Sequence, residues 1–218
     1  MSAVPVDLRA RLAADYVPVR PLASPWARAL WCVPFALLAL VAAPAYFNVR
    51  ADAARLGWLA WSTSLLQIAI GLAVIAAALR ESVPGRSWSR AAVALWLAMP
   101  LALAIAVTFG SWELSPVLLR GRFWLVWLLC LSGSAASALP VVALASILAA
   151  RAYPTRPLVV GGFVGLGAGV IADAGWRMFC HFSEPAHVLS AHVGGILVSM
   201  IAGVFLSIRL QPRGAIRL

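Results

Sequence analysis

Six long apolar runs constrain the fold of this chain more than any other feature. About 20 predominantly apolar residues in a helix suffice to cross a bilayer. Hydrophobic residues make up 63% of the chain and charged residues 11%, whereas soluble domains are about half apolar and about a quarter charged. We therefore predict an all-α, polytopic membrane protein surrounded by a lipid bilayer. The six predicted transmembrane helices are residues 29–47, 57–79, 91–112, 123–150, 158–179 and 188–208.

The distribution of arginine predicts the orientation of these spans. Every basic residue is an arginine, and twelve of them fall on the side that carries both chain ends, against five on the other side. Because cytoplasmic loops are enriched in Lys and Arg, the bias favours a cytoplasmic N-terminus and C-terminus. We thus expect a bundle over residues 26–209 between two cytoplasmic tails, residues 1–25 and 210–218. The five arginines on the outer side are Arg50, Arg55, Arg120, Arg122 and Arg177.

The formal net charge of +10 does not point to nucleic acid. A basic nucleic-acid-binding domain concentrates its charge on one face or stripe. Here the arginines occupy short intervals between apolar runs, so membrane topology explains them. We predict no direct nucleic acid binding.

The N-terminal tail has the pattern of a short amphipathic helix. Leu8, Leu12 and Tyr16 recur at four-residue spacing, with charged residues on the other faces. The following segment must be extended, because Pro18 and Pro21 each disfavour helix in the preceding residue. An isolated helix of this length is marginal in water, so we expect it to fold on a partner or on the membrane.

Small residues predict how the last two spans pack. The fifth span has Gly161, Gly165 and Gly169 four residues apart, and the sixth has small residues at the same spacing from Ala191 to Gly203. Such stripes let helix backbones approach closely in lipid. We predict a tight hairpin. The same stripe continues to Asp173 and Arg177, an intramembrane charge pair at i, i+4 spacing.

The loop after the fifth span concentrates the coordinating side chains of the chain. The candidate metal ligands are Cys180, His181, Glu184, His187 and His192. Thiolates and imidazoles suit transition metals, although their spacing matches no structural zinc pattern. Pro185 turns the chain, which would let His181 and His187 converge. On an α-helix, His187 and His192 would lie about 140° apart and would not share a face. The alternative is that these residues are interfacial polar groups that cap two helices.

Cys130 is a candidate partner for Cys180. It lies roughly 10 Å from the outer end of the fourth span and on the same side of the membrane as Cys180. A disulfide between them would need their Cα atoms within about 7 Å. The alternative is that Cys130 is only a small packing residue in a Ser- and Ala-rich helix face. Cys32 lies near the opposite end and is expected to serve only in packing.

No enzyme signature is present. The chain has no nucleophile elbow, and no phosphate-binding loop follows a strand. The glycine-rich run from Gly161 to Gly169 lies within a span and is interpreted as packing. We predict that the protein is not an enzyme and has no certain cofactor, with a transition metal ion as the possible one.

The whole chain resembles the NrsF family of bacterial membrane anti-sigma factors. The resemblance lies in the segment Leu12-Ala-Ala-Asp-Tyr-Val-Pro-Val-Arg-Pro-Leu22, the six spans, Cys130, and the pattern Asp173-x2-Trp176-x3-Cys180-x6-His187-x4-His192. It implies an inner-membrane protein that sequesters an extracytoplasmic-function sigma factor and releases it under stress. It also implies that Cys130 and Cys180 are a sensing pair. The implied sigma-binding residues are Leu8, Leu12, Tyr16, Val19, Arg20, Pro21 and Leu22.

Two other functions fit the sequence. A metal- or haem-binding membrane redox protein or transporter would use the three histidines as ligands, and absorbance spectra with metal analysis would reveal it. A scaffold subunit of a membrane complex would co-purify stoichiometrically with other membrane proteins.

Overall fold

The computed structural model describes residues 10, 13–14, 21–119, 121 and 123–211, with only the backbone of residues 54 and 55. Every regular element in this part of the chain is helical, which confirms the predicted all-α class. Six helical segments are long and apolar enough to cross a membrane, as expected. They are Pro25–Phe47, Trp58–Glu81, Arg90–Leu114, Phe123–Ala150, Pro157–Phe179 and Pro185–Arg209.

The first span differs in detail from its prediction, because it begins at Pro25 rather than at residue 29. It consists of α2 (Pro25–Ala29), a 3-10 turn η1 (Leu30–Cys32) and α3 (Val33–Phe47). Pro34 lies in the first turn of α3. Proline has no N–H to donate to the carbonyl four residues earlier, which is consistent with the tighter turn just before it.

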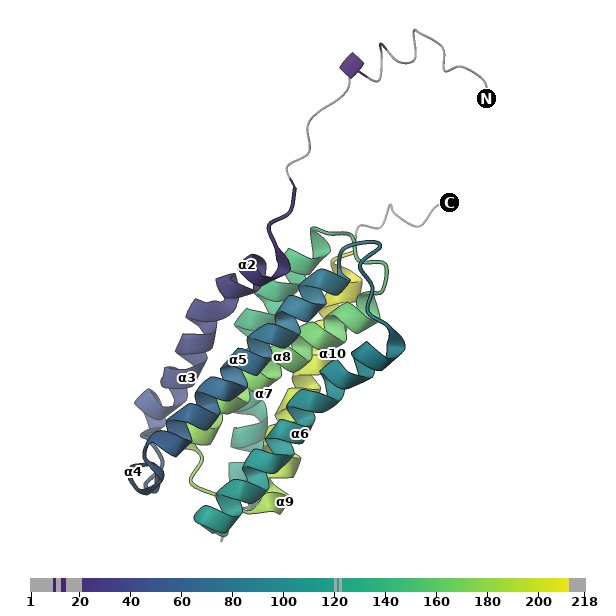
Figure 1. The fold of residues 1–218 in the computed structure, drawn as a ribbon. Helices are drawn as coiled ribbons and strands as arrows, with labels where there is room; N and C mark the ends of the chain where they lie inside the picture. Colours follow the sequence, from purple (N-terminus) through teal and green to yellow (C-terminus); the bar gives the residue numbers. More distant parts are fainter. Residues whose placement is uncertain (1–9, 11–12, 15–20, 120, 122, 212–218) are drawn as a thin grey trace.

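Four spans are single helices, and α8 is the centre of the bundle. They are α5 (Trp58–Glu81), α6 (Arg90–Leu114), α7 (Phe123–Ala150) and α8 (Pro157–Phe179). Residues 160–178 of α8 are all buried, and α8 contacts α3, α5, α6, α7 and α10 (Gly194–Arg209). Figure 1 shows α8 surrounded by the other helices.

The predicted hairpin of α8 and α10 is confirmed. A Cβ added at Gly165 would overlap the backbone of Ser199 and Met200, and one at Gly161 would lie 2.6 Å from the carbonyl oxygen of Gly203. The two backbones are therefore in direct contact, as small residues permit in lipid.

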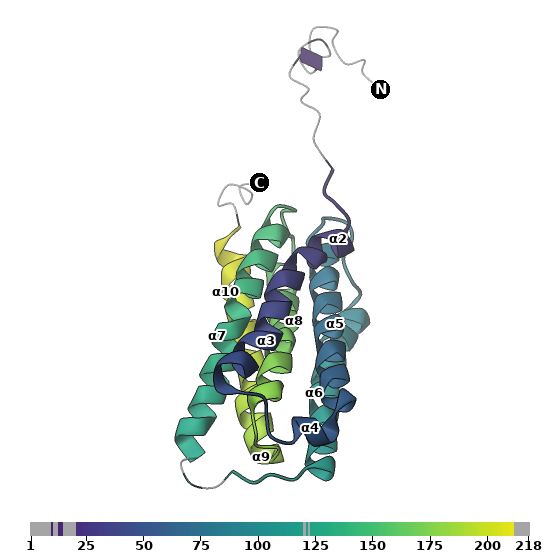
Figure 2. The ribbon, with the colours of Figure 1, turned by 90° about the vertical axis from the view of Figure 1, so that its left-hand side faces the viewer.

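The two ends of the bundle carry different elements. Helix α2 and the last turn of α10 lie at one end, and the short helices α4 (Ala53–Leu56) and α9 (Pro185–His187) lie at the other (Figures 1 and 2). We call these the terminal end and the loop end.

At the terminal end, a buried carboxylate ties three segments together. The Glu81 side chain is fully buried, accepts a hydrogen bond of 2.6 Å from the Trp88 backbone N–H, and lies 3.0 Å from Arg156 Nη1. Arg156 also donates to the Trp88 carbonyl. Each group in this network therefore has its partner, and the network fixes the start of α8 against α5 and the α5–α6 loop.

Candidate functional site

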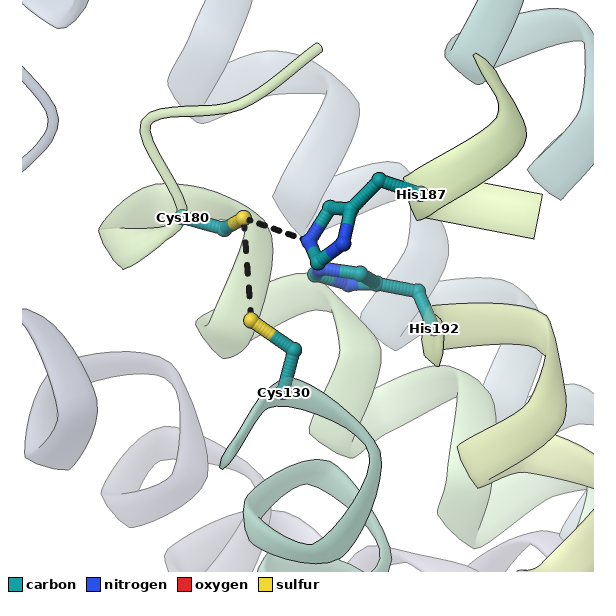
Figure 3. Close-up of side chains that lie close together, drawn as sticks. All are labelled: Cys130, Cys180, His187 and His192. Carbon is teal, nitrogen blue, oxygen red and sulfur yellow. Dashed lines mark hydrogen bonds between the residues drawn. The ribbon is translucent and has the colours of Figure 1, made fainter. Parts of the chain in front are cut away.

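Two thiols and two imidazoles meet in the interior at the loop end. The Cys130 and Cys180 sulfurs are 3.8 Å apart, and Cys180 Sγ lies 3.5 Å from His187 Nε2. One potential ligand atom from each of Cys130, Cys180, His187 and His192 lies within 4.8 Å of the others, and all four residues are buried. Figure 3 shows the two imidazole rings extending toward the sulfurs. We call these four residues the Cys/His cluster.

The cluster draws its residues from three spans that are far apart in sequence. Cys130 lies within α7, Cys180 is the residue that ends α8, and the histidines lie at the start of the sixth span. Cys180 adopts an extended backbone (ψ 114°) while its N–H still bonds to the Trp176 carbonyl. The chain therefore leaves α8 at the point where the thiol faces α7.

A π-helical segment overturns the expectation that His187 and His192 cannot share a face. The sixth span begins with α9, continues as the π-helix η2 (Val188–Val193) and becomes α-helical at Gly194. A π-helix bonds each residue to the one five positions away, so residues five apart come close to alignment. The two imidazole centroids lie 5.8 Å apart. The His-x4-His spacing was the available signal, because it equals one such turn.

A buried carboxylate supports the cluster from α8. Asp173 Oδ1 lies 2.8 Å from His192 Nδ1, and Asp173 Oδ2 accepts hydrogen bonds from Arg177 Nε (2.7 Å) and Gln67 Nε2 (2.9 Å). Arg177 also donates to the Thr108 hydroxyl on α6. The carboxylate thus orients His192 and links it to α5 and, through Arg177, to α6.

Sequence reasoning did not assign Gln67 and Thr108 to the site. Gln67 carries a detectable signal, since it is an amide within an apolar span. Thr108 carries none, because a threonine hydroxyl in a membrane helix ordinarily bonds to its own backbone, as Thr108 also does to Ala104.

The surroundings of Cys180 favour its thiolate. The hydrogen bond with Cys130 lowers the pKa of the Cys180 thiol most, burial opposes this, and His187 and His192 lower the pKa further. The net direction is well below the ordinary value of a cysteine. Because the thiolate is the nucleophile and the metal ligand, these surroundings suit Cys180 to either role.

Two predicted metal ligands lie outside the cluster. The His181 ring packs edge-on against Phe179, with centroids 6.2 Å apart, and His181 does not converge with His187. Glu184 accepts a hydrogen bond from the Leu119 N–H, so its carboxylate fastens the α6–α7 loop. Ser183 does the same, accepting from the Val117 N–H at 2.8 Å.

The α3–α5 connection is a third loop at the loop end. Arg50 and Asp52 form a bidentate pair with contacts of 2.5 and 2.6 Å, and the Arg50 N–H bonds to the Met178 carbonyl. Burial raises the pKa of Asp52, but hydrogen bonds from Arg50 and Ser115 outweigh it, and the net shift is downward. The α3–α5 connection is thereby fixed to the end of α8.

The predicted sigma-binding residues fall mostly outside the described part of the chain. These are Leu8, Leu12, Tyr16, Val19 and Arg20. Pro21 and Leu22 are described and exposed, and they precede α2 at the terminal end.

Fold and site together define a six-span helical membrane protein with a buried Cys/His cluster at one end. The model of the NrsF family, negative regulators of sigma F, matches residues 12–211, and the chain belongs to this family. The family description names regulators of a sigma factor, not a class of enzymes. No curated protein and no solved structure matches the chain.

Proposed function

We propose that this protein is an anti-sigma factor of a bacterial inner membrane. Its cytoplasmic residues 1–25 hold an extracytoplasmic-function sigma factor, and a metal ion or an oxidant acting on the periplasmic-side thiols Cys130 and Cys180 releases it. The observation that carries the proposal is that α9, which contains His187 of the Cys/His cluster, lies at the loop end, opposite the end at which α2 begins. Input and output are thus assigned to opposite sides of the membrane.

The tail suits a helix-in-groove interaction. Leu8, Leu12 and Tyr16 supply apolar anchors at helical spacing. The segment from Val19 to Leu22 adds a polar contact through Arg20 and a restricted backbone through Pro21. A sigma factor bound in this way is held at the membrane.

The thiol pair supports two kinds of input. A soft metal ion would bind the two sulfurs directly. Hydrogen peroxide would take two electrons from the thiols of Cys130 and Cys180. Their two protons would leave with its two oxygens as two water molecules. The new S–S bond would need the sulfurs to close from 3.8 Å to about 2.05 Å.

Helix α8 is the natural route between the two sides. Its 23 residues span about 35 Å, from Arg156 at the terminal end to Cys180 at the loop end. Because α8 contacts five other segments of the bundle, a displacement at Cys180 acts on the whole bundle.

Two experiments test the two halves of the proposal separately. A peptide of residues 1–25 should retain a co-expressed sigma factor in a pull-down, and a variant with Leu8, Leu12 and Tyr16 changed to Ala should not. A tail that retains no sigma factor would refute the output half.

For the input half, Cys130→Ser with Cys180→Ser should abolish release of the sigma factor by cadmium or peroxide, while Cys32→Ser should respond as the wild type does. Cys32 is the matched control. It is buried like Cys130 and Cys180, but it has no neighbouring thiol. A double variant with a normal response would refute a sensing role for the pair.

A metal- or haem-binding redox protein or transporter is the second candidate, and the four converging ligand atoms favour it. Absorbance spectra of the purified protein distinguish the two functions. A redox-active cofactor that turns over with an electron donor, together with a tail that binds no sigma factor, would establish this second candidate.

A further inference from the structure

An unpaired nitrogen of the Cys/His cluster points to a ligand. His192 is fully buried, and its Nδ1 is engaged by Asp173. Its Nε2 has no hydrogen-bond partner among the described residues. Because Asp173 occupies Nδ1, Nε2 is the nitrogen that His192 can offer beside the two sulfurs. A buried nitrogen without a partner is costly, so this geometry calls for an atom at the centre of the cluster.

We infer that the cluster is a closed, tetrahedral binding site for a resident zinc-class divalent ion, with Cys130 Sγ, Cys180 Sγ, His187 Nε2 and His192 Nε2 as ligands. The inference deepens the proposed function, because it names what the sensing thiols hold before a signal arrives. Only the statement that the ion occupies the thiols before a signal rests on the proposed function.

The distances between the donor atoms fit such an ion. With Zn–S bonds of about 2.3 Å and Zn–N bonds of about 2.0–2.1 Å, a tetrahedral site places two sulfurs about 3.8 Å apart and a sulfur and a nitrogen about 3.6 Å apart. The corresponding separations here are 3.8 Å for Cys130–Cys180 and 3.5 Å for Cys180–His187. The remaining pairs of donor atoms lie within 4.8 Å of one another and would draw closer when the ion binds.

The charge of the site favours a divalent ion. Two thiolates and two neutral imidazoles balance a charge of +2, and the neighbouring Asp173–Arg177 pair is itself neutral. An uncompensated charge at a buried site is expensive. A monovalent copper ion would leave this centre with a net negative charge.

The surroundings of His192 match the outer shell of known metal sites. Metal-bound histidines almost always donate their other N–H to a carboxylate, a carbonyl or water, which fixes the tautomer and raises the basicity of the ligand. Asp173 holds this position, and Arg177 and Gln67 hold its second oxygen. Asp173 is therefore a positioning residue for the ion.

Metal analysis of the full-length protein, purified in detergent under reducing conditions, tests the inference. We expect one zinc per chain, an X-ray absorption signature of two sulfur and two nitrogen ligands, and tetrahedral d–d bands after exchange with Co²⁺. A reduced, monodisperse protein that contains no zinc and takes up no Co²⁺ would overturn the inference.

Variants with matched controls locate the site. Cys130→Ser and His192→Ala should each weaken Co²⁺ binding more than tenfold in competition with a chelator. Cys32→Ser and His181→Ala should bind as the wild type does, since both residues lie outside the cluster. Equal loss in the controls would overturn the assignment. Helical content and elution volume show whether each variant has folded, and the wild-type Co²⁺ spectrum decides the matter if one has not.

The positioning role of Asp173 has its own readout. Asp173→Asn should weaken Co²⁺ binding about 10–100-fold and shift the tetrahedral bands. Arg177→Gln disturbs the same charge pair without touching His192, and it should weaken binding less. If both variants weaken binding equally with unshifted bands, Asp173 acts only on stability.

The sigma-factor pull-down on the same preparations separates this inference from the proposed function. Zinc in a protein whose tail binds no sigma factor refutes only the function. Sigma binding by a protein that takes up no metal refutes only the zinc site.

Discussion

Two carboxylates are buried in the bundle, one toward each end, and their hydrogen-bond networks differ. Glu81 and Asp173 are both fully buried, and each is paired with an arginine. The Glu81 network ends in a backbone N–H and a carbonyl, so its groups are all satisfied. The Asp173 network ends in an imidazole whose second nitrogen faces two sulfurs. A closed network holds helices together, whereas an open one can also receive a ligand.

The largest effect is expected from Asp173→Ala. It leaves the Arg177 guanidinium buried without its partner, and breaking a buried pair in this way costs about 3–5 kcal/mol. The free energy of unfolding in mixed micelles should fall by this amount, and metal binding should fall with it. A variant as stable as the wild type would show that water reaches Arg177.

Glu81→Ala should be less damaging, and it should leave the metal site intact. Arg156 is 36% exposed, so it regains solvent when its partner is removed. The remaining cost, about 2–3 kcal/mol, comes from the buried Trp88 N–H and the lost pair. Unfolding measurements with metal analysis check both points, and loss of bound metal would contradict the contrast between the two ends.

Gly165→Val tests the packing of α8 against α10, which lies between the two ends. The added side chain would overlap the backbone of Ser199 and Met200, and overpacking of this kind costs about 1–3 kcal/mol. Because α10 carries on from the histidine-bearing segment, Co²⁺ affinity should also fall. The control is Gly162→Ala, since a Cβ at Gly162 meets nothing within 4 Å.

The smallest effect is expected from Asp52→Asn at the loop end. The lowered pKa of Asp52 means that its ionised form stabilises the fold above its unfolded pKa of about 3.9. That contribution is lost as the pH falls through the lower, folded value. The variant should thus be less stable at pH 7 by up to about 1 kcal/mol, and the difference should shrink below pH 4. A difference that grows in acid would exclude this explanation.

The sequence contained most of the fold and part of the site. Span limits follow from hydrophobic length, and the close contact of α8 with α10 follows from glycine spacing, because both are local properties of the chain. The association of His187 with His192 did not follow from α-helical periodicity, because their five-residue spacing brings them onto one face only where the helix accommodates an extra residue. His181 and Glu184 have suitable chemistry, but loop contacts with Phe179 and Leu119 direct their side chains elsewhere.

The π-helical segment also sets the phase between two faces of one span. Upstream of it, His187 faces the sulfurs, and downstream, Gly195, Ser199 and Gly203 lie buried, with Ser199 and Gly203 against α8. Deleting Leu189 would keep the span apolar and helical, yet it would turn the residues before the deletion by about 100° relative to the residues after it. The stripe would still pack while His187 faced away from the sulfurs. The extra residue therefore acts as an angular spacer that lets one helix serve both a packing surface and a ligand set.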